Sequence, residues 1–348
     1  MPGILIIAPN WIGDAVMTQP LLAKLQSQFP NSTIDVLASS WVAPIYRACA
    51  QVNEVIEAQF THRQLQWALR KQLAKDLQAK QYQFCFVLPS SFKSALIPWL
   101  ANIPLRIGYR GDLRYGLINL ALDNPSKTNR PPMAQHYLAL ADVVANMAND
   151  DPSRSTDFTQ QPQLQIQANA QKRVEQKLQD KTIDPATTYV LCPGAEYGPT
   201  KRWPTEHFAA LTNAILEQDA NHNVILLGGP NDKTLANQII QLSEKSDRLH
   251  DWCGTCSLDE SIALIGLCKT VVSNDSGLMH IAAALKTPQV AIFGSSDPKH
   301  TPPLSDKAKV IWLHLPCSPC HQRECPLGHL NCLKEIEPQQ VLATLNTL

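Results

Sequence analysis

The sequence lacks an excess of charge of either sign. Its 348 residues include 30 lysines and arginines and 30 aspartates and glutamates, and the pI is near 7.1. Nucleic-acid-binding proteins usually carry a net basic face, so this balance argues against a nucleic-acid partner. Hydrophobic residues make up 44% of the chain and charged residues 17%, which excludes extensive disorder and supplies enough material for packed cores.

A long hydrophobic run and an export signal are also missing. The apolar stretch at residues 95–105 is interrupted by Pro98, Asn102 and Pro104, and it falls short of the roughly 18 residues that span a bilayer. The first residues lack the basic start of a signal peptide. We therefore expect a cytoplasmic protein, and peripheral contact with a membrane surface stays open.

The loop after the first apolar run lacks the glycines of a dinucleotide-binding fold. An NAD-dependent enzyme would carry G-x-G-x-x-G there, whereas residues 9–14 (PNWIGD) contain Gly13 alone. Asp14 ends this loop, at the carboxyl side of the first expected strand and the start of a helix. It is either an N-cap, which stabilises a helix by about 1 kcal/mol, or a catalytic base, and the two roles are compatible.

Short apolar runs alternate with helical patterns along most of the chain, as in parallel sheets with helical crossovers. The expected strands are residues 4–8, 34–38, 84–88, 189–192, 224–227, 270–273 and 289–293. The expected helices are residues 15–29, 64–80, 205–217, 232–244, 258–267 and 276–285. The length fits two domains, and the polar segment at about 150–167 predicts their linker. The sequence thus predicts an α/β protein with two Rossmann-like, doubly wound parallel-sheet domains facing across a ligand-binding cleft.

One loop of the second half carries residues suited to a pyrophosphate. Residues 192–204 follow an expected strand and contain Gly194, Gly198 and the adjacent cations Lys201 and Arg202. Glycines allow close backbone approach, and the cations neutralise phosphate charge. The same residues would also suit a solvated basic turn.

Two further loops in this half point to the same chemistry. Residues 226–230 contain Gly228, where a nucleotide could pack against backbone, and in residues 273–280 Ser276 and Gly277 open a helix. The free N–H groups of such a helix suit an anion without help from a metal. Each loop alone also fits an ordinary turn or a capped helix, but their order favours one shared nucleotide site.

Several of these motifs resemble one known family. The ADP-heptose:lipopolysaccharide heptosyltransferases, glycosyltransferase family 9, are similar at residues 11–14 (WIGD), 193–196 (PGAE), 201–204 (KRWP) and 274–280 (NDSGLMH). Residues 89–95 (PSSFKSA) and 108–116 (GYRGDLRYG) look most like the type II members. The resemblance runs over nearly the whole chain.

The resemblance implies a GT-B fold, in which residues 1–165 bind the acceptor and residues 166–348 bind ADP-heptose. It implies inverting, metal-independent transfer of L-glycero-D-manno-heptose to the first heptose of the Kdo–lipid A inner core of lipopolysaccharide. Catalysis would need no cofactor and no stable protein partner. The acceptor, heptosyl-Kdo–lipid A, would place the enzyme at the cytoplasmic face of the inner membrane.

The resemblance also implies roles for individual residues. Asp14 matches the general base that deprotonates the acceptor hydroxyl, and Lys201 matches the lysine that neutralises the departing ADP. Besides Lys201, the implied donor-binding residues are Gly13, Glu196, Tyr197, Gly228, Cys256, Asp275, Ser276, Gly277 and His280. At positions 196 and 197 some members carry hydroxyl residues instead.

A basic segment in the first half suggests where the acceptor binds. Between residues 93 and 114 the chain has four cations against the single acid Asp112. We interpret Lys93, Arg110 and Arg114 as acceptor-binding residues, because guanidinium groups form bidentate contacts with phosphates and carboxylates. The alternative is a solvated basic loop.

The ten cysteines, in a chain without an export signal, indicate reduced thiols or metal ligands rather than disulfides. Cys317, Cys320, Cys325 and Cys332 form a dense cluster, with His321 and His329 among them. Four such ligands would suit a structural zinc, although the spacing is not that of a standard zinc finger. Unpaired reduced thiols and a disulfide are the alternatives, and a catalytic metal is not expected.

The sequence also leaves three rival functions open. A type I or type III heptosyltransferase would differ mainly in its acceptor. A nucleotide-sugar epimerase of the same fold would release sugar or isomerised donor without an acceptor. A catalytically silent GT-B protein would bind the sugar nucleotide as a sensor and would have no need of Asp14.

Overall fold

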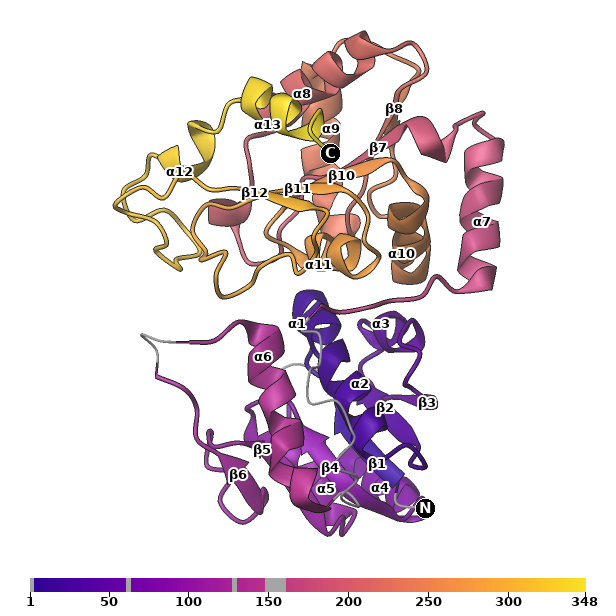
Figure 1. Ribbon diagram of the computed structural model, residues 1–348, viewed down its shortest axis with the longest axis vertical. Helices are drawn as coiled ribbons and strands as arrows, with labels where there is room; N and C mark the ends of the chain where they lie inside the picture. Colours follow the sequence, from indigo (N-terminus) through magenta and orange to yellow (C-terminus); the bar gives the residue numbers. More distant parts are fainter. Residues whose placement is uncertain (1–2, 61–63, 127–129, 148–160) are drawn as a thin grey trace. The chain divides into compact units, whose positions relative to one another are not determined.

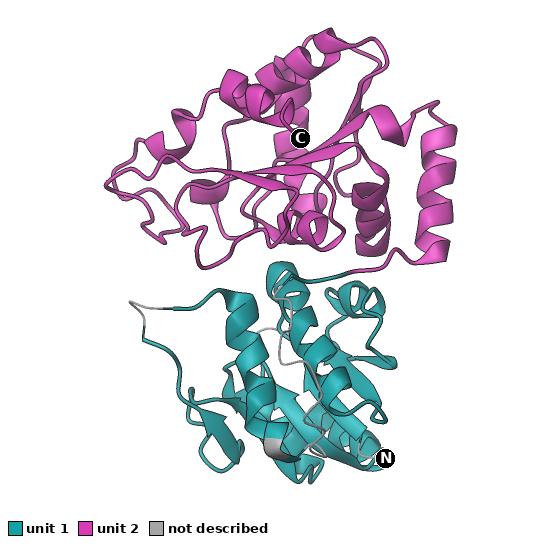
Figure 2. Cartoon of the chain, in the orientation of Figure 1, with its two compact units in different colours: residues 1–163 teal, residues 164–348 magenta. Residues whose placement is uncertain are grey.

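The computed structural model describes residues 3–60, 64–126, 130–147 and 161–348 (Figure 1). The chain forms two compact units, unit 1 over Met1–Gln163 and unit 2 over Leu164–Leu348 (Figure 2). The sequence placed this boundary between residues 165 and 166, inside a linker at about 150–167. Residues 150–160 of that linker lie outside the described residues.

Unit 1 is a doubly wound α/β unit built on one parallel sheet in the order β3-β2-β1-β4-β5-β6. Its strands are β1 (Gly3–Ile7), β2 (Ile34–Ala38), β3 (Glu54–Glu57), β4 (Tyr82–Val87), β5 (Leu105–Tyr109) and β6 (Leu120–Leu122). Its helices are α1 (Ile12–Met17), α2 (Gln19–Gln28), α3 (Ala43–Arg47), α4 (Trp67–Gln78), α5 (Phe92–Leu100), α6 (Met133–Leu138) and the 3-10 helix η1 (Ala139–Met147). The central strand β1 pairs Ile4 with Ile34 of β2 and with Phe84 of β4.

Unit 2 repeats this plan, with a parallel sheet in the order β12-β11-β10-β7-β8-β9. Its strands are β7 (Thr188–Cys192), β8 (Asn223–Leu226), β9 (Leu249–Asp251), β10 (Thr270–Asn274), β11 (Gln289–Ile292) and β12 (Ala308–Ile311). Its helices are α7 (Ala168–Gln179), α8 (Thr205–Gln218), α9 (Lys233–Leu242), α10 (Leu258–Leu267), α11 (Gly277–Ala284), α12 (Asn331–Lys334) and α13 (Pro338–Leu345). Three 3-10 turns complete it, η2 (Pro185–Thr187), η3 (Pro199–Lys201) and η4 (Pro230–Asp232).

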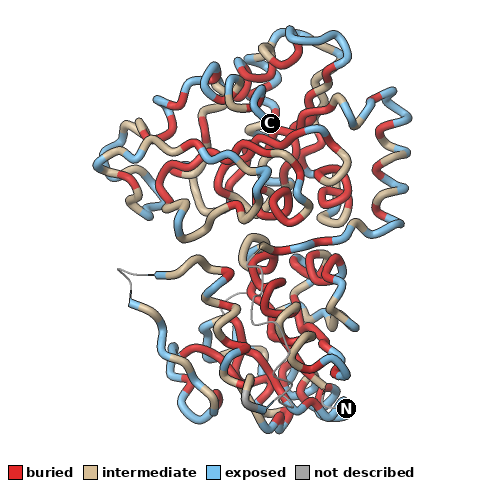
Figure 3. Tube along the Cα trace, in the orientation of Figure 1, coloured by how far each residue is buried: buried red, intermediate tan, exposed pale blue. Residues whose placement is uncertain are grey.

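The central strands are buried because helices cover both faces of each sheet. Every residue of β7, β10 and β11 is buried (Figure 3). This burial explains the continuous apolar runs in the sequence, since a strand covered on both faces has no solvated side.

In unit 2 the largest fully buried side chain is Trp203, which packs 4.9 Å from the ring of Phe208 and donates its indole N–H to the carbonyl of Ile336 at 2.9 Å. The loop that follows β7 is therefore anchored in the core by Trp203.

Within the part of the chain that the structure describes, no helix combines the length and apolar character needed to cross a bilayer.

Candidate functional site

Lys201 and Asp275 form a partly buried ion pair at the carboxyl edge of the unit 2 sheet. Lys201 ends the turn η3 after β7, and Asp275 directly follows β10, the neighbour of β7 in the sheet. The Nζ of Lys201 lies 2.5 Å from Oδ2 of Asp275, and the hydroxyl of Ser296 donates to the same oxygen at 2.5 Å. The side chain of Asp275 is 4% exposed and that of Lys201 is 18% exposed. The pair therefore holds the ammonium of Lys201 in a fixed position, where it stays partly accessible.

The preceding residue, Asn274, ties the lysine loop to this strand. Its buried Oδ1 accepts a hydrogen bond from the backbone N–H of Trp203 at 3.0 Å, and its Nδ2 donates to the carbonyl of Pro193 at 2.8 Å. The two bonds hold both ends of the loop that carries Lys201. The sequence assigned no role to Asn274, because its partners lie about 70 to 80 residues away in the chain.

A cavity of about 130 Å³ opens beside Lys201. Its lining is rich in polar groups and consists of Tyr197, Lys201, Ser295, Ser296, Asp297, His300, Thr301 and His321. The ring of Tyr197 lies 5.2 Å from Nζ of Lys201, and its hydroxyl donates to the carbonyl of His321 at 2.7 Å. The structure thus brings Tyr197 and Lys201, two of the expected donor-binding residues, to one cavity, which Ser296, His300, Thr301 and His321 also line.

Helix α11 begins at the same edge of the sheet. Its N-cap residue is Ser276, in extended conformation, and the side chain of Ser276 makes no capping hydrogen bond. The Ser276 hydroxyl instead lies 3.1 Å from that of Ser273. The N–H groups at the start of α11, including that of Gly277, keep the polarity that binds oxyanions.

His280 lies on the same helix but is buried, with 5% of its surface exposed. Burial lowers the pKa of His280 to about 4. The negative charge of Asp275 opposes this shift, and the positive charge of Lys201 adds to it. His280 is therefore neutral at pH 7, so it adds no positive charge to the site.

Gly194 of the lysine loop and Gly228 of the loop after β8 make room for a carboxylate. A Cβ on Gly194 would lie 2.3 Å from the side chain of Asp232, and one on Gly228 would lie 2.6 Å from it. Asp232 accepts a hydrogen bond from the N–H of Gly229 at 2.9 Å. Burial raises the pKa of Asp232, and the nearby Glu196 raises it further, while the Gly229 N–H and Arg202 oppose the shift. Gly228 and Glu196 thus adjoin a partly buried acid that the sequence did not identify.

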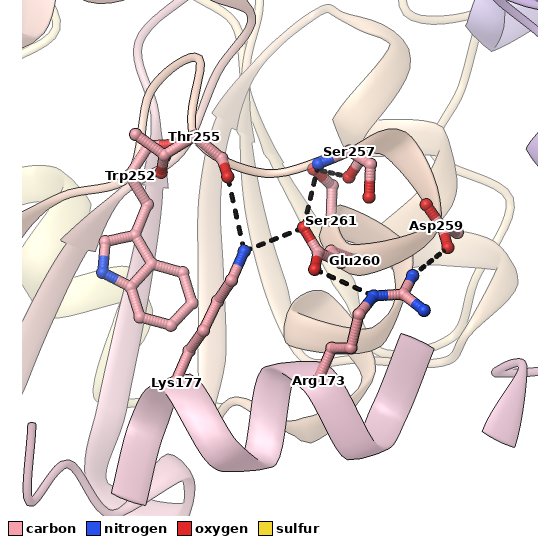
Figure 4. A network of polar contacts seen from close by, with 8 residues as sticks. All are labelled: Arg173, Lys177, Trp252, Thr255, Ser257, Asp259, Glu260 and Ser261. Carbon is pink, nitrogen blue, oxygen red and sulfur yellow. Dashed lines mark hydrogen bonds and ion pairs between the residues drawn. The ribbon is translucent and has the colours of Figure 1, made fainter. Parts of the chain in front are cut away.

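Cys256 lies in the loop between β9 and α10, which a charged network holds in place (Figure 4). Lys177 of α7 donates to the carbonyl of Thr255 at 3.3 Å and to Oε2 of Glu260 at 2.9 Å. Arg173 donates to Oε1 of Glu260 at 3.1 Å, and the N–H of Ser257 donates to Oε2 at 3.1 Å. The network fixes this loop against α7.

The pKa values of Glu260 and Cys256 are shifted in opposite directions. Burial alone would raise the pKa of Glu260, but hydrogen bonds from Lys177, Ser257 and Arg173 outweigh it and lower the pKa to about 2. Burial raises the pKa of Cys256 to about 11, so its thiol is protonated at neutral pH. A neutral thiol suits packing against a ligand rather than nucleophilic chemistry.

In unit 1, Asp14 is the third residue of α1, next to Gly13. The N-cap position belongs to Trp11, whose side chain makes no capping bond, so the N-cap alternative does not hold for Asp14. Asp14 is half-buried. Burial is the main cause of the raised pKa of Tyr46 and Tyr137, and the negative charge of Asp14 adds to both shifts. Asp14 thus acts electrostatically on two buried phenols of unit 1.

The three residues expected to bind the acceptor differ in their surroundings, and Arg114 is buried. Arg114 is 3% exposed, and its guanidinium donates to the carbonyls of Pro89, at 2.7 Å, and Tyr109. Because these bonds hold the guanidinium inside the loop, Arg114 braces the backbone and is not part of an exposed surface. Arg110 is exposed and pairs with Asp123 at 2.9 Å. Lys93, on the first turn of α5, donates to the carbonyl of Gln64 at 3.1 Å.

The expected structural zinc is not supported either. Cys317, Cys320, Cys325 and Cys332 line one cavity of about 20 Å³ together with His329, and all ten cysteines are free. Across the described ranges, however, no three His, Cys, Asp or Glu side chains are arranged to hold a metal ion.

The residues around these cysteines support the lysine loop. The hydroxyl of Thr200, next to Lys201, donates to the carbonyl of Gln322 at 2.5 Å. The segment therefore backs the loop that carries Lys201.

Comparisons with known proteins agree over the length of the chain. Residues 70–331 match glycosyltransferase family 9 (heptosyltransferase). The chain is 39% identical to lipopolysaccharide heptosyltransferase 2 of Escherichia coli K12, over 99% of this chain and 98% of the relative. It is 38% identical to lipooligosaccharide heptosyltransferase 2 of Haemophilus influenzae, over 99% of each chain. The solved structure of E. coli ADP-heptose LPS heptosyltransferase II is similar with a TM-score of 0.84 at 37% identity, covering 100% of this chain and 98% of that one.

Proposed function

Because the chain belongs to glycosyltransferase family 9, the heptosyltransferases, we propose that it transfers L-glycero-D-manno-heptose from ADP-heptose to the first heptose of the Kdo–lipid A inner core. The fold is GT-B, with two parallel six-stranded sheets. The relatives from E. coli and H. influenzae, which match over nearly their whole length, are named heptosyltransferase 2, and this supports the type II acceptor. The observation that carries the proposal is the Lys201–Asp275 pair beside the start of α11.

Unit 2 is proposed to bind the donor. The diphosphate of ADP-heptose would lie against the ammonium of Lys201 and the first N–H groups of α11, beside Ser276 and Gly277. Negative charge grows on the departing ADP as the bond to the anomeric carbon breaks. A preoriented cation stabilises that charge more than it stabilises the bound substrate, which is the requirement for catalysis. Asp275 and Ser296 keep Lys201 in position.

Unit 1 is proposed to bind the acceptor and supply the base. In an inverting displacement, the acceptor oxygen attacks the anomeric carbon on the face opposite ADP. Asp14 would take the proton of that hydroxyl as the new bond forms. With Lys201 and backbone N–H groups on the phosphate, the proposed reaction needs no metal ion. The lipid-linked acceptor would bring the enzyme to the cytoplasmic face of the inner membrane.

Mass spectrometry of the reaction tests this proposal. The protein is incubated with ADP-heptose and purified cores that bear zero, one or two heptoses. We expect a gain of one heptose on the one-heptose core alone. A gain on the zero-heptose or two-heptose core would assign a type I or type III acceptor. No gain on any core, with ADP-heptose binding intact, would contradict transferase activity and favour a silent sensor.

A further inference from the structure

The loop after β9, residues 252–257, lies at the same edge of the unit 2 sheet as Lys201. In the strand order β10-β7-β8-β9, two steps separate β7 from β9, a distance of about 10 Å at the usual strand spacing. The loop after β8 lies between them, because the N–H of Gly254 donates to the carbonyl of Gly228 at 2.9 Å. A ligand that extends from Lys201 past Gly228 therefore reaches residues 252–257.

The accessible groups of this loop are uncharged. Gly254 and Thr255 are exposed, and Cys256 is half-buried with a protonated thiol, because burial raises its pKa to about 11. Gly254 has a φ of +71°, and a Cβ there would lie 3.0 Å from Cα of Pro230, so only glycine fits without strain. The lysine and the helix start that suit an anion follow β7 and β10 instead. The charged part of a nucleotide therefore fits at β7 and β10, and its uncharged nucleoside fits at β9.

Two anchors hold the backbone on either side of Cys256 (Figure 4). The ammonium of Lys177 donates to the carbonyl of Thr255 at 3.3 Å, and the carboxylate of Glu260 accepts the N–H of Ser257 at 3.1 Å. Lys177 also donates to Glu260 at 2.9 Å, so the two anchors are joined. Because Thr255 and Ser257 are the chain neighbours of Cys256, this pair of side chains sets the position of Cys256.

The anchors matter more for the position of the loop than for the stability of the fold. The side chain of Lys177 is 37% exposed, and exposed ion pairs contribute little to the free energy of unfolding. Apolar contacts hold α7 in place, with Ala170, Val174 and Leu178 buried. Loss of the ammonium of Lys177 should therefore release residues 252–257 without unfolding unit 2.

We propose that Lys177 and Glu260 are positioning residues for the nucleoside half of the donor. They hold residues 254–256 in the conformation that packs against the base and the ribose, and they do not touch the ligand themselves. The proposal rests on the proposed function, because it takes the diphosphate of ADP-heptose to lie at Lys201. A displaced loop weakens the contacts of the nucleoside alone, since the groups that hold the diphosphate follow other strands.

Isothermal titration with ADP and with inorganic pyrophosphate tests the proposal, because the two probes share the diphosphate and differ in the nucleoside. Lys177→Met should raise the Kd of ADP by about 10-fold, the effect of one lost hydrogen bond from a charged group. The Kd of pyrophosphate should stay as in the wild type. In transfer assays the KM of ADP-heptose should rise with the Kd of ADP while kcat is unchanged, as for a lost binding contact outside the reacting atoms.

Two further variants separate positioning from a general effect on unit 2. Lys177→Arg keeps a donor at this place and should recover most of the lost ADP affinity. Lys269→Met is the control, since Lys269 directly precedes β10 at the opposite edge of the sheet, with its Nζ 3.3 Å from Nε2 of His222. This control should bind both probes as the wild type does.

The proposal is overturned if Lys177→Met binds ADP as tightly as the wild type does, or if it loses affinity for ADP and pyrophosphate equally. Equal affinity of the wild type for the two probes also overturns it, because the nucleoside would then contribute nothing. If Lys177→Met does not fold, Glu260→Gln replaces it, and an unchanged Kd of ADP in that variant overturns the proposal.

A failure of the proposed function would look different. The wild type would then bind ADP but transfer heptose to no core. The titrations need no transfer, so they still decide the role of Lys177 and Glu260. A wild type that does not bind ADP overturns the positioning proposal itself.

Discussion

The ammonium of Lys201 and the carboxylate of Asp275 lie 2.5 Å apart on loops that follow the adjacent strands β7 and β10. Neighbouring parallel strands end at the same sheet edge, so these residues, 74 positions apart in the sequence, come into contact. The carboxylate orients the lysine, and the lysine remains partly accessible. This relationship links the sequence motif at residues 274–280 to the chemistry proposed for the lysine loop.

Replacement of Asp275 tests that link. Asp275→Asn removes the negative partner of Lys201, so we expect kcat to fall by about 100-fold because the ammonium loses its orientation. The free energy of unfolding should fall by about 3 kcal/mol, because a buried ion pair is broken. Ser296→Ala is the control, since it removes one hydrogen bond to the same oxygen and should cost about 1 kcal/mol. Equal effects of the two variants on kcat and stability would contradict a special role for the ion pair.

The buried His280 predicts a pH dependence of stability. Its pKa is about 4 in the folded protein, below the ordinary value of 6.5, so protonation favours the unfolded chain. This contribution is complete above pH 6.5 and is lost as the pH falls to 4, by about 3 kcal/mol at most. Urea unfolding of wild type and His280→Gln between pH 7 and pH 4 measures it. The variant should show a shallower loss, and parallel curves would show that His280 does not titrate as described.

The space that glycine leaves for Asp232 can be tested by a double-mutant cycle. Gly194→Ala places a Cβ 2.3 Å from the Asp232 side chain and should lower the free energy of unfolding by about 1–3 kcal/mol. In an Asp232→Ala background the same change should cost less, because the obstacle is gone. Gly229→Ala is the control, since its Cβ would lie 3.8 Å from the nearest atom. Additive effects of the two substitutions would exclude a direct clash.

Removal of metal ions tests the electrostatic account of the donor site. If Lys201 and the N–H groups of α11 neutralise the diphosphate, prolonged treatment with EDTA should leave the rate of heptose transfer within about twofold. The zinc content of the same samples, measured by mass spectrometry, is the control. Activity that disappears with zinc and returns on its addition would contradict this account and reinstate a metal at Cys317, Cys320, Cys325 and Cys332.

Most of the fold could be predicted from the sequence, because strands buried on both faces are continuous apolar runs. Strands that lack a continuous apolar run were not predicted. An example is β3, whose sequence is EVIE and whose two glutamates are exposed. The helix expected at residues 15–29 is divided at Thr18, whose hydroxyl bonds to the carbonyl of Ala15 at 2.7 Å. A local hydrogen bond of this kind leaves no trace in hydrophobic periodicity.

The candidate site was predictable where motifs lie in loops after strands, as at Lys201 and Ser276. The structure brings Lys201 and Asp275 into contact, but the catalytic and binding roles given to these residues stay predictions. The burial of Arg114 could not be predicted, because it depends on the carbonyls of Pro89 and Tyr109.

The transfer rate of Asp14→Asn tests the central claim most directly. The substitution keeps the size of the side chain and removes its ability to take a proton. With saturating ADP-heptose and the one-heptose core, we predict that kcat falls by about 10²- to 10⁴-fold while the Kd of ADP-heptose is unchanged. A rate equal to that of the wild type would contradict the assignment of Asp14 as the base of heptose transfer.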